Sequence, residues 1–386
     1  MKVIVINLGS TSFKFKLFEM DTQTVLASGD VERIGGRGAW RMKLPKADSG
    51  SEVIPTHEDA FRMMMGKLVD TGIISSLADI DAVGYKAVHG GELSGAAIID
   101  DAVMAQMEKM IPFAPAHNPM YLKVMRSMAQ EYPNLVQVAC FETSFHRTIP
   151  EYRAVYGVPY EWVKEYGIRR YGFHGSSHSY IAMMMKKLEP SASRVISLHL
   201  GGSSSICAIL DGKSVATSMG ASLQSGLFHN NRAGDFDSFA VPVLAKELGG
   251  IDEAMKALSS RSGFLGLSGV SGDMRDVIEA AQNGNVRAKL TFDAFCDNIT
   301  GFIGMHSAYM AGVDCLCFTG GIGQHCKPLR EAVCAHLGYE IDATVDEGRL
   351  SPENSKPAIY AIETNEELMV ARSTVECLRE NQDCPS

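Results

Sequence analysis

Several short polar clusters contain residue types that carry chemistry in enzymes. YGFHGSSH contains His174 and His178, four positions apart, and FETSFH places Glu142 directly after the strand-like segment LVQVACF. Histidines at this spacing on a helix can ligate zinc. Gly175 lies between them, however, and favours a turn. The histidine pair is therefore interpreted as part of a turn rather than as a zinc site.

Three further clusters each have a structural interpretation that competes with a role in binding. Arg232 in NNRAGDFD could simply brace Asp235, and His117 in APAHNP could be a hydrogen-bonding loop residue. Asp273 and Arg275 in SGDMRD could do no more than cap a helix. Each cluster is weak evidence when taken singly, and their combination is much more informative.

Two glycine-rich turns join pairs of predicted strands. NLGSTS follows the apolar run at residues 3–6, and HLGGSSS follows a similar run about 190 residues later. Glycines let an anion approach the backbone closely, and successive N–H groups can bind it. Two such turns facing each other would bind one polyphosphate. The alternative is two tight hairpins without a ligand, but these would not need hydroxyl groups at positions 10–12 and 203–205.

The first turn belongs to a predicted βββ-α-β unit. The β-branched run at 3–6 indicates a strand buried on both faces. Residues 13–17 alternate between apolar residues and lysine, as in a half-exposed strand, and residues 25–31 can supply a third strand. A helix is expected to follow, with Thr56 and Asp59 as its capping pair.

The second half of the chain repeats this pattern. Residues 195–220 match the first three strands, with Asp211-Gly212 as a hairpin turn. A later strand should place Cys315 and Cys317 on one face. A repeat of about 190 residues is too long for a solenoid. It predicts two similar domains that face each other across a cleft.

Composition restricts the class of protein. The chain has 386 residues, a net charge of −9, 46% apolar residues and 21% charged residues. These values are typical of a globular protein of about two domains. The negative charge argues against nucleic acid as a partner, because no basic excess is available to neutralise phosphates. No signal peptide and no membrane span are expected, since no apolar run approaches about 18 residues.

The cysteines and the absence of several known motifs restrict the class of protein further. The nine cysteines are odd in number and scattered, which is typical of reduced thiols in the cytoplasm. The chain contains no Walker sequence, no G-x-G-x-x-G, no H-E-x-x-H and no G-x-S-x-G. A Walker-type NTPase, a dinucleotide fold, a zinc peptidase and a serine hydrolase are therefore not indicated.

The chain resembles the acetate kinase family, which belongs to the superfamily of sugar kinases, heat-shock ATPases and actin. The motifs that carry the resemblance run nearly from end to end: NLGSTSFKFKLF, VHGG, APAHNP, FETSFHRTIP, YGIRRYGFHGSSH, LHLGGSSS, TSMG, RAGDFD, SGVSGDMRD, FTGGIG and ETNEELMVAR. Few other families combine GIRRYGFHG with SFHRTIP. The resemblance implies reversible, ATP- and Mg²⁺-dependent phosphorylation of a short-chain carboxylate to an acyl phosphate, with acetate first and propionate next.

The resemblance also implies roles for individual residues. Glu142, His174 and Arg232 would be catalytic, and Lys86 and His117 would bind the substrate. The residues implied to bind the nucleotide and its phosphates are Asn7, Ser10, Ser12, Lys14, His199, Gly201, Gly202, Asp273, Met274, Arg275, Gly321, Ile322 and Gly323.

The implied chemistry agrees with these residue types. Asn7 and Glu366 would hold Mg²⁺. A carboxylate is already ionised at neutral pH, so it needs no general base. The difficulty is to bring an anion up to a negatively charged phosphoryl group, which requires positioning, a cation and Mg²⁺. Arg232 is permanently charged and planar, and His174 can donate a hydrogen bond even when it is neutral.

Four positions depart from the family pattern. Lys86 stands where the family usually has Arg, and Glu142 where it has Asp. Gly202 replaces the amide residue of HLGNG, and Asn230-Asn231 replace a Gly-Thr pair before the arginine. These changes leave three interpretations: a kinase with a changed carboxylate or phosphoryl donor such as butyrate or pyrophosphate, a slower acetate kinase, or a nucleotide-binding paralogue with a regulatory or scaffold role.

The predicted fold is α/β, with two similar domains of duplicated βββαβαβα topology. The first domain, on the acyl and phosphoryl side, should span 1–150 and be completed by a C-terminal helix at 368–386. The second, at 151–367, should bind the nucleotide. The resemblance suggests a cytoplasmic homodimer formed through the second domain, without a nucleic-acid or membrane partner.

Overall fold

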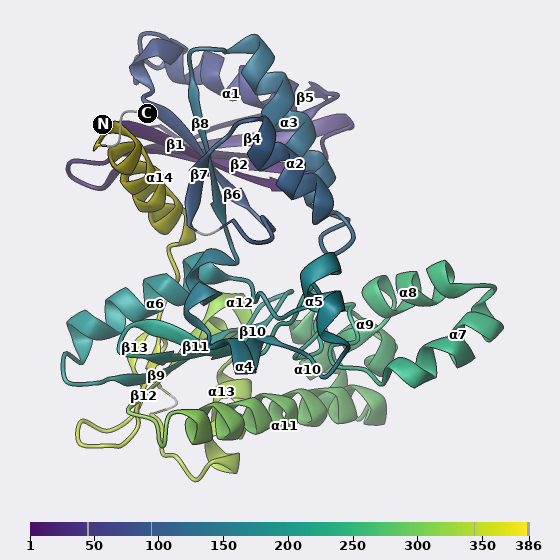
Figure 1. Ribbon diagram of the computed structural model, residues 1–386. Helices are drawn as coiled ribbons and strands as arrows, with labels where there is room; N and C mark the ends of the chain where they lie inside the picture. Colours follow the sequence, from purple (N-terminus) through teal and green to yellow (C-terminus); the bar gives the residue numbers. More distant parts are fainter. Residues whose placement is uncertain (45, 94, 343, 384–386) are drawn as a thin grey trace. The chain divides into compact units, whose positions relative to one another are not determined.

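A computed structural model describes residues 1–44, 46–93, 95–342 and 344–383. The chain divides into two compact units, each built around one β-sheet (Figure 1). The first unit comprises Met1–Ser144 and the C-terminal segment that begins at Asn365, and the second comprises Phe145–Thr364.

The sheet of the first unit has the strand order β5-β4-β3-β2-β1-β6-β8-β7. Its strands are β1 (Lys2–Gly9), β2 (Ser12–Glu19), β3 (Thr24–Glu32), β4 (Gly36–Leu44), β5 (Asp48–Ile54), β6 (Ala82–Ala87), β7 (Ala96–Ile98) and β8 (Val136–Phe141). β1 pairs antiparallel with β2 and parallel with β6. Its residues 3–6 are fully buried, which confirms the predicted central strand.

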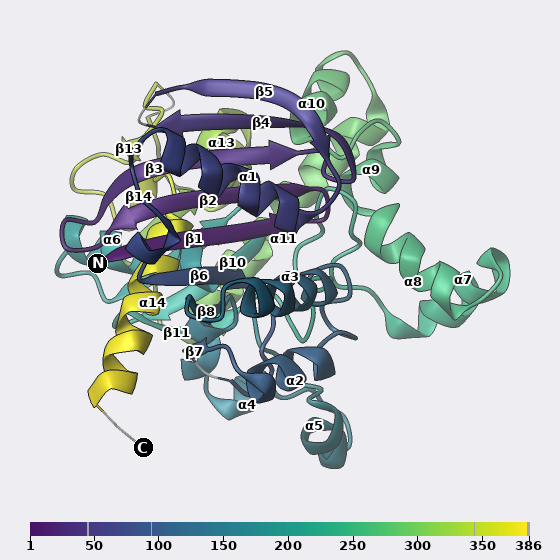
Figure 2. The ribbon, with the colours of Figure 1, turned by 90° about the horizontal axis from the view of Figure 1, so that it is seen from above.

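Two strands of this unit were not predicted from the sequence. β4 and β5 lie between the third strand and the first helix, where the sequence predicted a direct connection. β5 is exposed at nearly every position, so its sequence DSGSEVI has no apolar alternation. Backbone pairing to β4 holds this edge strand, and an apolar pattern cannot reveal such pairing. Figure 2 shows β1 to β5 side by side, with α1 lying across them.

The described part of the first unit has four α-helices beside its sheet. They are α1 (His57–Asp70), α2 (Asp101–Lys109), α3 (Asn118–Glu131) and α14 (Glu366–Asp383), with a short 3₁₀ helix, η1 (Leu77–Asp79). Thr56 caps α1 by accepting the Asp59 N–H, as predicted. Val370 and Val375 of α14 pack with Val3 and Val5. A Cβ at Gly84 would lie 2.4 Å from Thr374 Oγ1, so the glycine lets α14 approach β6.

The sheet of the second unit has the order β11-β10-β9-β12-β14-β13. Its strands are β9 (Arg194–His199), β10 (Ser205–Leu210), β11 (Lys213–Thr217), β12 (Cys315–Thr319), β13 (Gly348–Arg349) and β14 (Ala358–Ala361). Its helices are α4 (Glu151–Ala154), α5 (Tyr160–Tyr166), α6 (Gly175–Leu188), α7 (Val241–Leu248), α8 (Ile251–Ser260), α9 (Gly263–Ser268), α10 (Met274–Gln282), α11 (Val286–Tyr309), α12 (Gly320–His325) and α13 (Lys327–His336), with 3₁₀ helices η2 (Ser144–Thr148) and η3 (Ser238–Ala240).

The two faces of this sheet have separate cores. Phe295 and Ile299 of α11 pack with Ile196 and Leu198, whose side chains point to one face. Ile181 of α6 packs with residues of the other face, including Cys315 and Cys317, which share that face as predicted. The eight described cysteines are free thiols, while Cys384 lies outside the described residues.

The predicted α/β class with two similar domains is confirmed. β1, β2, β3 and β6 recur as β9, β10, β11 and β12, with the same neighbours in each sheet. Asp211 and Gly212 form the β10–β11 turn with φ of 49° and 77°, as the Asp-Gly dipeptide predicted. Among the described helices, none is both long and apolar enough to cross a membrane.

One local prediction was wrong. Gly175 was expected to place His174 and His178 in a turn, but it is the first residue of α6. His174 itself adopts the left-handed conformation, with φ of 59°, and is the N-cap residue. Because His174 makes the turn, the helix can begin at Gly175 and His178 lies inside it.

Candidate functional site

A pocket of about 870 Å³ opens in the second unit. It lies where β9 and β12 end, and because these strands are parallel, their carboxyl ends lie at the same edge of the sheet. Its lining residues are Gly201, Gly202, Asn230, Gly272, Asp273, Met274, Arg275, Ile278, Gly321, Ile322, His325, Cys326 and Pro328. The volume and the mixture of apolar and polar residues are typical of a small-molecule site.

The loop between β9 and β10 forms one wall of this pocket. Ser204 is fully buried and holds the loop by two bonds to Gly201, one accepted from its N–H and one donated to its carbonyl. The Ser204 N–H donates to His229 Nδ1 over 2.9 Å. Burial, together with the nearby charge of Arg232, lowers the pKa of His229 to about 3, so its Nδ1 remains an acceptor at neutral pH.

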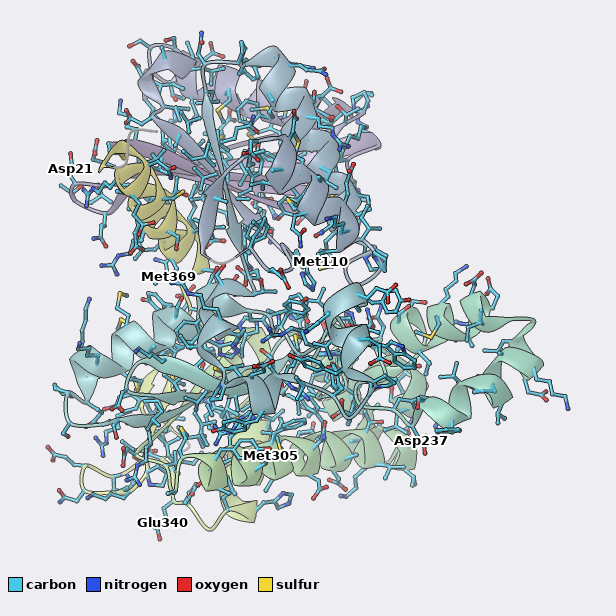
Figure 3. The ribbon with its side chains drawn as sticks, in the orientation of Figure 1. Asp21, Met110, Asp237, Met305, Glu340 and Met369 are labelled. Carbon is cyan, nitrogen blue, oxygen red and sulfur yellow. The ribbon has the colours of Figure 1, made fainter. Side chains whose placement is uncertain are left out.

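The segment from His229 to Arg232 is tied to the same loop. Asn230 N–H donates to the Gly202 carbonyl, and Arg232 Nη1 donates to Ser203 Oγ at 3.1 Å. Arg232 is half-buried, and the loss of solvent around its guanidinium lowers the pKa of that group. Asp235 Oδ1 instead accepts the Gly226 N–H, and the described residues contain no Arg232–Asp235 ion pair. The interpretation of Arg232 as a brace for Asp235 is therefore wrong. Asp237, labelled in Figure 3, caps η3 further along the segment.

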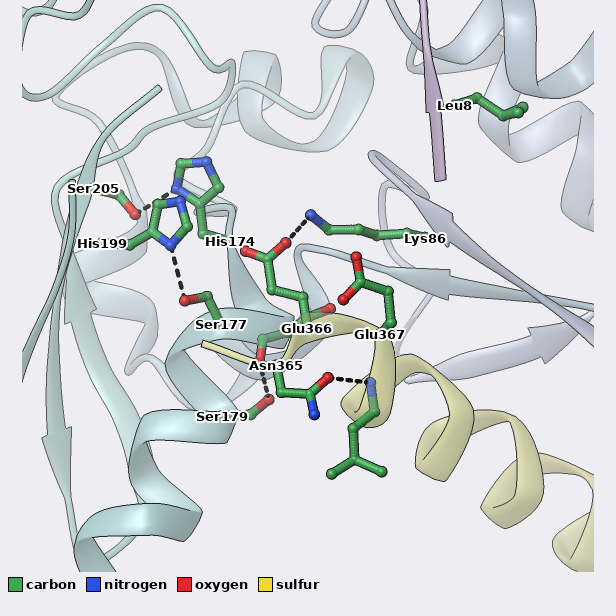
Figure 4. A network of polar contacts seen from close by, with 12 residues as sticks. Leu8, Lys86, His174, Ser177, Ser179, His199, Ser205, Asn365, Glu366 and Glu367 are labelled. Atoms are coloured by element: carbon green, nitrogen blue, oxygen red, sulfur yellow. Dashed lines mark hydrogen bonds and ion pairs between the residues drawn. The ribbon is translucent and has the colours of Figure 1, made fainter. Parts of the chain in front are cut away.

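A chain of hydrogen bonds runs from His174 into the core of the second unit. Ser205 Oγ lies 2.8 Å from both His174 Nδ1 and His178 Nε2 (Figure 4 draws the His174 contact). His178 Nδ1 lies 2.8 Å from Ser197 Oγ. Burial holds the pKa of His178 well below its ordinary value, so this ring is neutral and carries one proton. If that proton is on Nε2, Ser205 donates to His174 Nδ1, and His174 carries its own proton on Nε2.

His199 lies beside His174. Their ring centroids are 4.2 Å apart in a stacked arrangement, and His199 Nδ1 lies 2.8 Å from Ser177 Oγ (Figure 4). Ser177 is in the first turn of α6, which His174 caps, so one helix end positions both rings. Two of the predicted site residues are therefore brought together here.

The start of α10 forms another wall of the pocket. Asp273 is its N-cap, accepting the Arg275 N–H at 2.9 Å, and its carboxylate also pairs with the Arg275 side chain. This ion pair lowers the pKa of Asp273. The predicted helix cap is therefore confirmed. Both residues also line the pocket, so capping does not exclude a binding role, which stays a prediction.

In the first unit, several charged residues surround Lys86 on β6. Its Nζ forms an ion pair with Glu366 at the start of α14 (Figure 4). Burial lowers the pKa of Lys86, but Glu366 and Glu142 raise it more, and the result lies above the ordinary value. Glu142 follows β8 and is itself buried, and its N–H donates to the Ala87 carbonyl. This group therefore combines one half-buried ammonium with carboxylates that raise its pKa.

The first glycine turn is a tight hairpin. Gly9 pairs with Ser12, so the turn itself contains two residues, and Ser10 is exposed. Asn7 lies in β1 opposite Lys14 of β2. In the same unit, His117 is the residue before α3.

The comparisons with known proteins agree with this arrangement. The family model described as the acetokinase family matches residues 2–372. The acetate kinase of Geobacillus sp. (strain WCH70) is 40% identical over 97% of this chain and 98% of its own length. The chain belongs to the acetokinase family. It is therefore a kinase whose acceptor is a carboxyl group.

Solved structures of this family have the same fold. The crystal structure of Porphyromonas gingivalis acetate kinase is 36% identical, covers 98% of this chain and 99% of its own, and has a TM-score of 0.87. That of a propionate kinase from Francisella tularensis is 34% identical, with 96% and 98% coverage and a TM-score of 0.90.

Seven of the predicted nucleotide-binding residues line the pocket of this acetokinase family member. They are Gly201, Gly202, Asp273, Met274, Arg275, Gly321 and Ile322. Gly323 is not among the lining residues; it is buried, and a Cβ there would lie 3.4 Å from the Leu198 carbonyl. Asn7, Ser10, Ser12, Lys14, Lys86, His117, Glu142 and Glu366 belong to the first unit, and their predicted roles stay predictions.

Two residues that organise the site were not assigned a role from the sequence. His229 accepts the Ser204 N–H, and Asn230 lines the pocket. Both lie in the segment before Arg232, where the sequence departs from the family pattern, and that departure was the available signal.

Proposed function

We propose that the protein catalyses reversible, ATP- and Mg²⁺-dependent phosphorylation of a short-chain carboxylate to an acyl phosphate, with acetate first and propionate next. The observation that carries the proposal is the pocket at the carboxyl ends of β9 and β12. Its apolar residues Met274, Ile278 and Ile322 suit a nucleobase, and its glycines at 201 and 202 suit phosphates.

The reaction requires no general base from the protein. The acceptor carboxylate is ionised at neutral pH. One of its oxygens forms a bond to the γ-phosphorus while the bond from that phosphorus to the leaving diphosphate breaks. The role of the protein is to position the two anions and to offset their charge.

Arg232 and His174 are the proposed phosphoryl-stabilising residues. Ser203 fixes the guanidinium of Arg232 from one side, and its half-buried position strengthens its interaction with an anion. Ser205 and His178 fix the ring of His174, so the hydrogen bond that it donates is preorganised. Positioned donors cost no reorganisation when charge moves during transfer.

The carboxylates around Lys86 support the proposal of a magnesium ion with few protein ligands, because the described residues contain no cluster of three or more His, Cys, Asp or Glu side chains that could hold a metal. The negative charges of Glu366, Glu142 and Glu367 all raise the pKa of Lys86, so three carboxylates act on one ammonium. Mg²⁺ prefers such oxygen ligands and keeps several waters. We propose that Glu366 and Asn7 hold the ion, with Glu142 beside it. A bound Mg²⁺ would offset the negative charge of the phosphates.

We further propose that the protein acts in the cytoplasm as a homodimer formed through the second domain. Free cysteines support the location. Exposed apolar side chains on η3, α7 and α8 support a surface that a second copy covers: Phe239, Val243, Ile251 and Met255. Sedimentation of the purified protein should give twice the mass of one chain.

The experiment that tests the activity traps acyl phosphate with hydroxylamine. Purified protein is incubated with ATP and Mg²⁺ and with acetate, propionate or butyrate in turn, and the reverse reaction is run with ADP. Product with acetate or propionate, lost on addition of a chelator, is the expected result. Lack of product with every acid, and with pyrophosphate as donor, would contradict a kinase function. ADP binding without turnover would then favour a regulatory paralogue.

A further inference from the structure

Asn230 holds an unusual position in the pocket wall. It is one of the lining residues, and it lies between two glycines of other segments. A Cβ on Gly202 would lie 3.5 Å from Asn230 Nδ2, and a Cβ on Gly272 would lie 3.5 Å from Asn230 Cβ. The side chain of Asn230 therefore lies beside space that two missing side chains leave open.

The orientation of the Asn230 amide is fixed by its own backbone. Its Oδ1 accepts the Asn231 N–H at 2.8 Å. Because an N–H needs an acceptor, the oxygen must occupy this position and the NH₂ group the other. Among the described residues, Nδ2 has no hydrogen-bond partner, so its two N–H donors remain available beside Gly202, where a Cβ would lie 3.5 Å from Nδ2.

The backbone of Asn230 is held equally firmly. Its N–H donates to the Gly202 carbonyl at 3.3 Å, and its carbonyl accepts the Leu265 N–H at 2.9 Å. The backbone of Asn230 is therefore hydrogen-bonded to both the β9–β10 loop and α9, which fixes the position of its side-chain amide. A donor pair held in this way is preorganised for an acidic oxygen, since little ordering remains to be done on binding.

We infer that Asn230 is the residue that recognises the diphosphate group of the phosphoryl donor, through hydrogen bonds from Nδ2. This inference rests on the proposed function, because it concerns the donor of that reaction. Phosphate oxygens are strong acceptors with negative charge, and hydrogen bonds to charged groups are stronger than neutral ones. Either a nucleoside diphosphate or pyrophosphate could supply this chemistry.

The inference explains two departures from the family pattern together. The family pattern implied by the sequence resemblance has an amide at position 202 and a glycine at position 230, whereas this chain has Gly202 and Asn230. The amide of Asn230 lies against the place where a side chain on residue 202 would start. The amide that the family pattern places on residue 202 is therefore replaced by an amide on the neighbouring residue 230.

Calorimetric titration of the full-length protein tests this without turnover. ADP, pyrophosphate and adenosine are the three probes, used with Asn230→Ala, Asn230→Asp and the wild type. Ala removes two hydrogen bonds to a charged group, so ADP should bind about tenfold more weakly. The Asn230→Asp variant keeps the hydrogen bond to the Asn231 N–H but places negative charge near the phosphates. Its affinity for ADP should fall roughly a hundredfold. Adenosine should bind all three proteins alike.

A matched control and a rescue separate the amide from its surroundings. Asn283→Asp makes the same charge change at the exposed end of α10 and should leave ADP affinity unchanged. Asn230→Gly should lose affinity as Asn230→Ala does. Adding Gly202→Asn should restore most of it, because residue 202 lies outside the left-handed region and can carry a side chain.

The outcomes decide between the possibilities. ADP affinity that is unchanged in Asn230→Asp overturns the inference, as does a double variant that stays as weak as Asn230→Gly, since the loss would then belong to the loop backbone. If wild-type protein binds pyrophosphate but not ADP, and Asn230→Asp weakens pyrophosphate, the inference holds while ATP as the donor is wrong. Binding of neither by the wild type overturns the inference, and the hydroxylamine assay then decides the proposed function separately.

Discussion

The two glycine turns differ in structure although their sequences are alike. The β1–β2 turn has Gly9 paired with Ser12, so only residues 10 and 11 lie outside the ladder. Between His199 and Ser205, by contrast, the β9–β10 connection leaves five residues outside its ladder. The second turn contributes Gly201 and Gly202 to the pocket, whose lining contains no residue of the first turn.

The difference indicates how the connection between two antiparallel strands can form the wall of a pocket. In the first unit, Leu8 N–H donates to the Tyr121 hydroxyl and His57 Nε2 bonds to the Gly9 carbonyl, so the backbone groups near the tip are used to hold the hairpin. In the second unit, Ser204 and His229 hold the loop from its buried side. Side-chain bonds from beneath stabilise a wider loop and leave its outer face for a ligand.

The largest expected effect concerns Arg232, which is bonded to the second turn through Ser203. Arg232→Ala should lower kcat by about a thousandfold, because a cation that stabilises the transferring phosphoryl group is lost. Steady-state assay of acyl phosphate formation measures this. ADP affinity, measured by calorimetry, should change only a fewfold.

Arg232→Lys is the matched control, since it keeps the charge and removes the planar fork. It should recover part of the lost rate but not all of it. An alanine variant that retains wild-type kcat would show that the second turn only binds the donor, and that the phosphoryl group is stabilised elsewhere.

A smaller effect should separate the two turns directly. Ser204→Ala removes both bonds to Gly201 and loosens the loop, so ADP should bind about tenfold more weakly. Ser10→Ala, in the exposed tip of the first turn, should lower ADP affinity less than Ser204→Ala does, because Ser10 holds no part of the loop that lines the pocket. Parallel calorimetric titrations compare the two.

Thermal unfolding of both variants controls for folding, since Ser204 is fully buried and Ser10 is exposed. If Ser10→Ala weakened ADP as much as Ser204→Ala, the two turns would contribute equally to nucleotide binding. The contrast drawn from their hydrogen bonds would then be wrong.

Local features of the sequence predicted much of the fold. The buried run at 3–6, the Thr56 cap and the Asp211-Gly212 turn each follow from neighbouring residues, and each was predicted correctly. The edge strand β5 was missed because its residues bury almost nothing. The apolar pattern of a sequence indicates which side chains are buried. β5 is held by backbone hydrogen bonds to β4 instead, which that pattern does not reveal.

The site was harder to predict because it depends on contacts between distant segments. Motifs located Gly201 and Asp273, which line one pocket, although the two lie far apart in the sequence. The role of His229 could not be inferred from the sequence. Its hydrogen-bond donor, the Ser204 N–H, lies 25 positions earlier, and nothing in the residues around His229 indicates that contact. Loop width was also hidden, since NLGSTS and HLGGSSS differ little in residue type.

The smallest expected effect is a loss of stability at acidic pH, because the buried His229 holds the second turn. The pKa of His229 is lowered to about 3 by burial and by Arg232, and that of His306 on α11 to about 3 by burial and by Arg170 and Arg153. An unfolded histidine binds a proton near pH 6.5. Between these values the unfolded chain binds more protons, so stability is present above about pH 6.5 and falls as pH falls. Each histidine should lower the free energy of unfolding by about 1 kcal/mol between pH 7.5 and 5.5.

Two matched variants separate this acid sensitivity from the role of His229 in the turn. His229→Leu and His306→Leu should each flatten the fall in unfolding free energy by about 1 kcal/mol, measured by urea unfolding at pH 7.5 and 5.5. At pH 7.5 His229→Leu should also lose about 1 kcal/mol and bind ADP more weakly, because the buried Ser204 N–H loses its acceptor. His306→Leu should lose nothing, since neither ring nitrogen of His306 has a hydrogen-bond partner among the described residues. Equal loss of ADP affinity in both variants would mean that His229 acts by filling space, and that the second turn is not held open by its hydrogen bond.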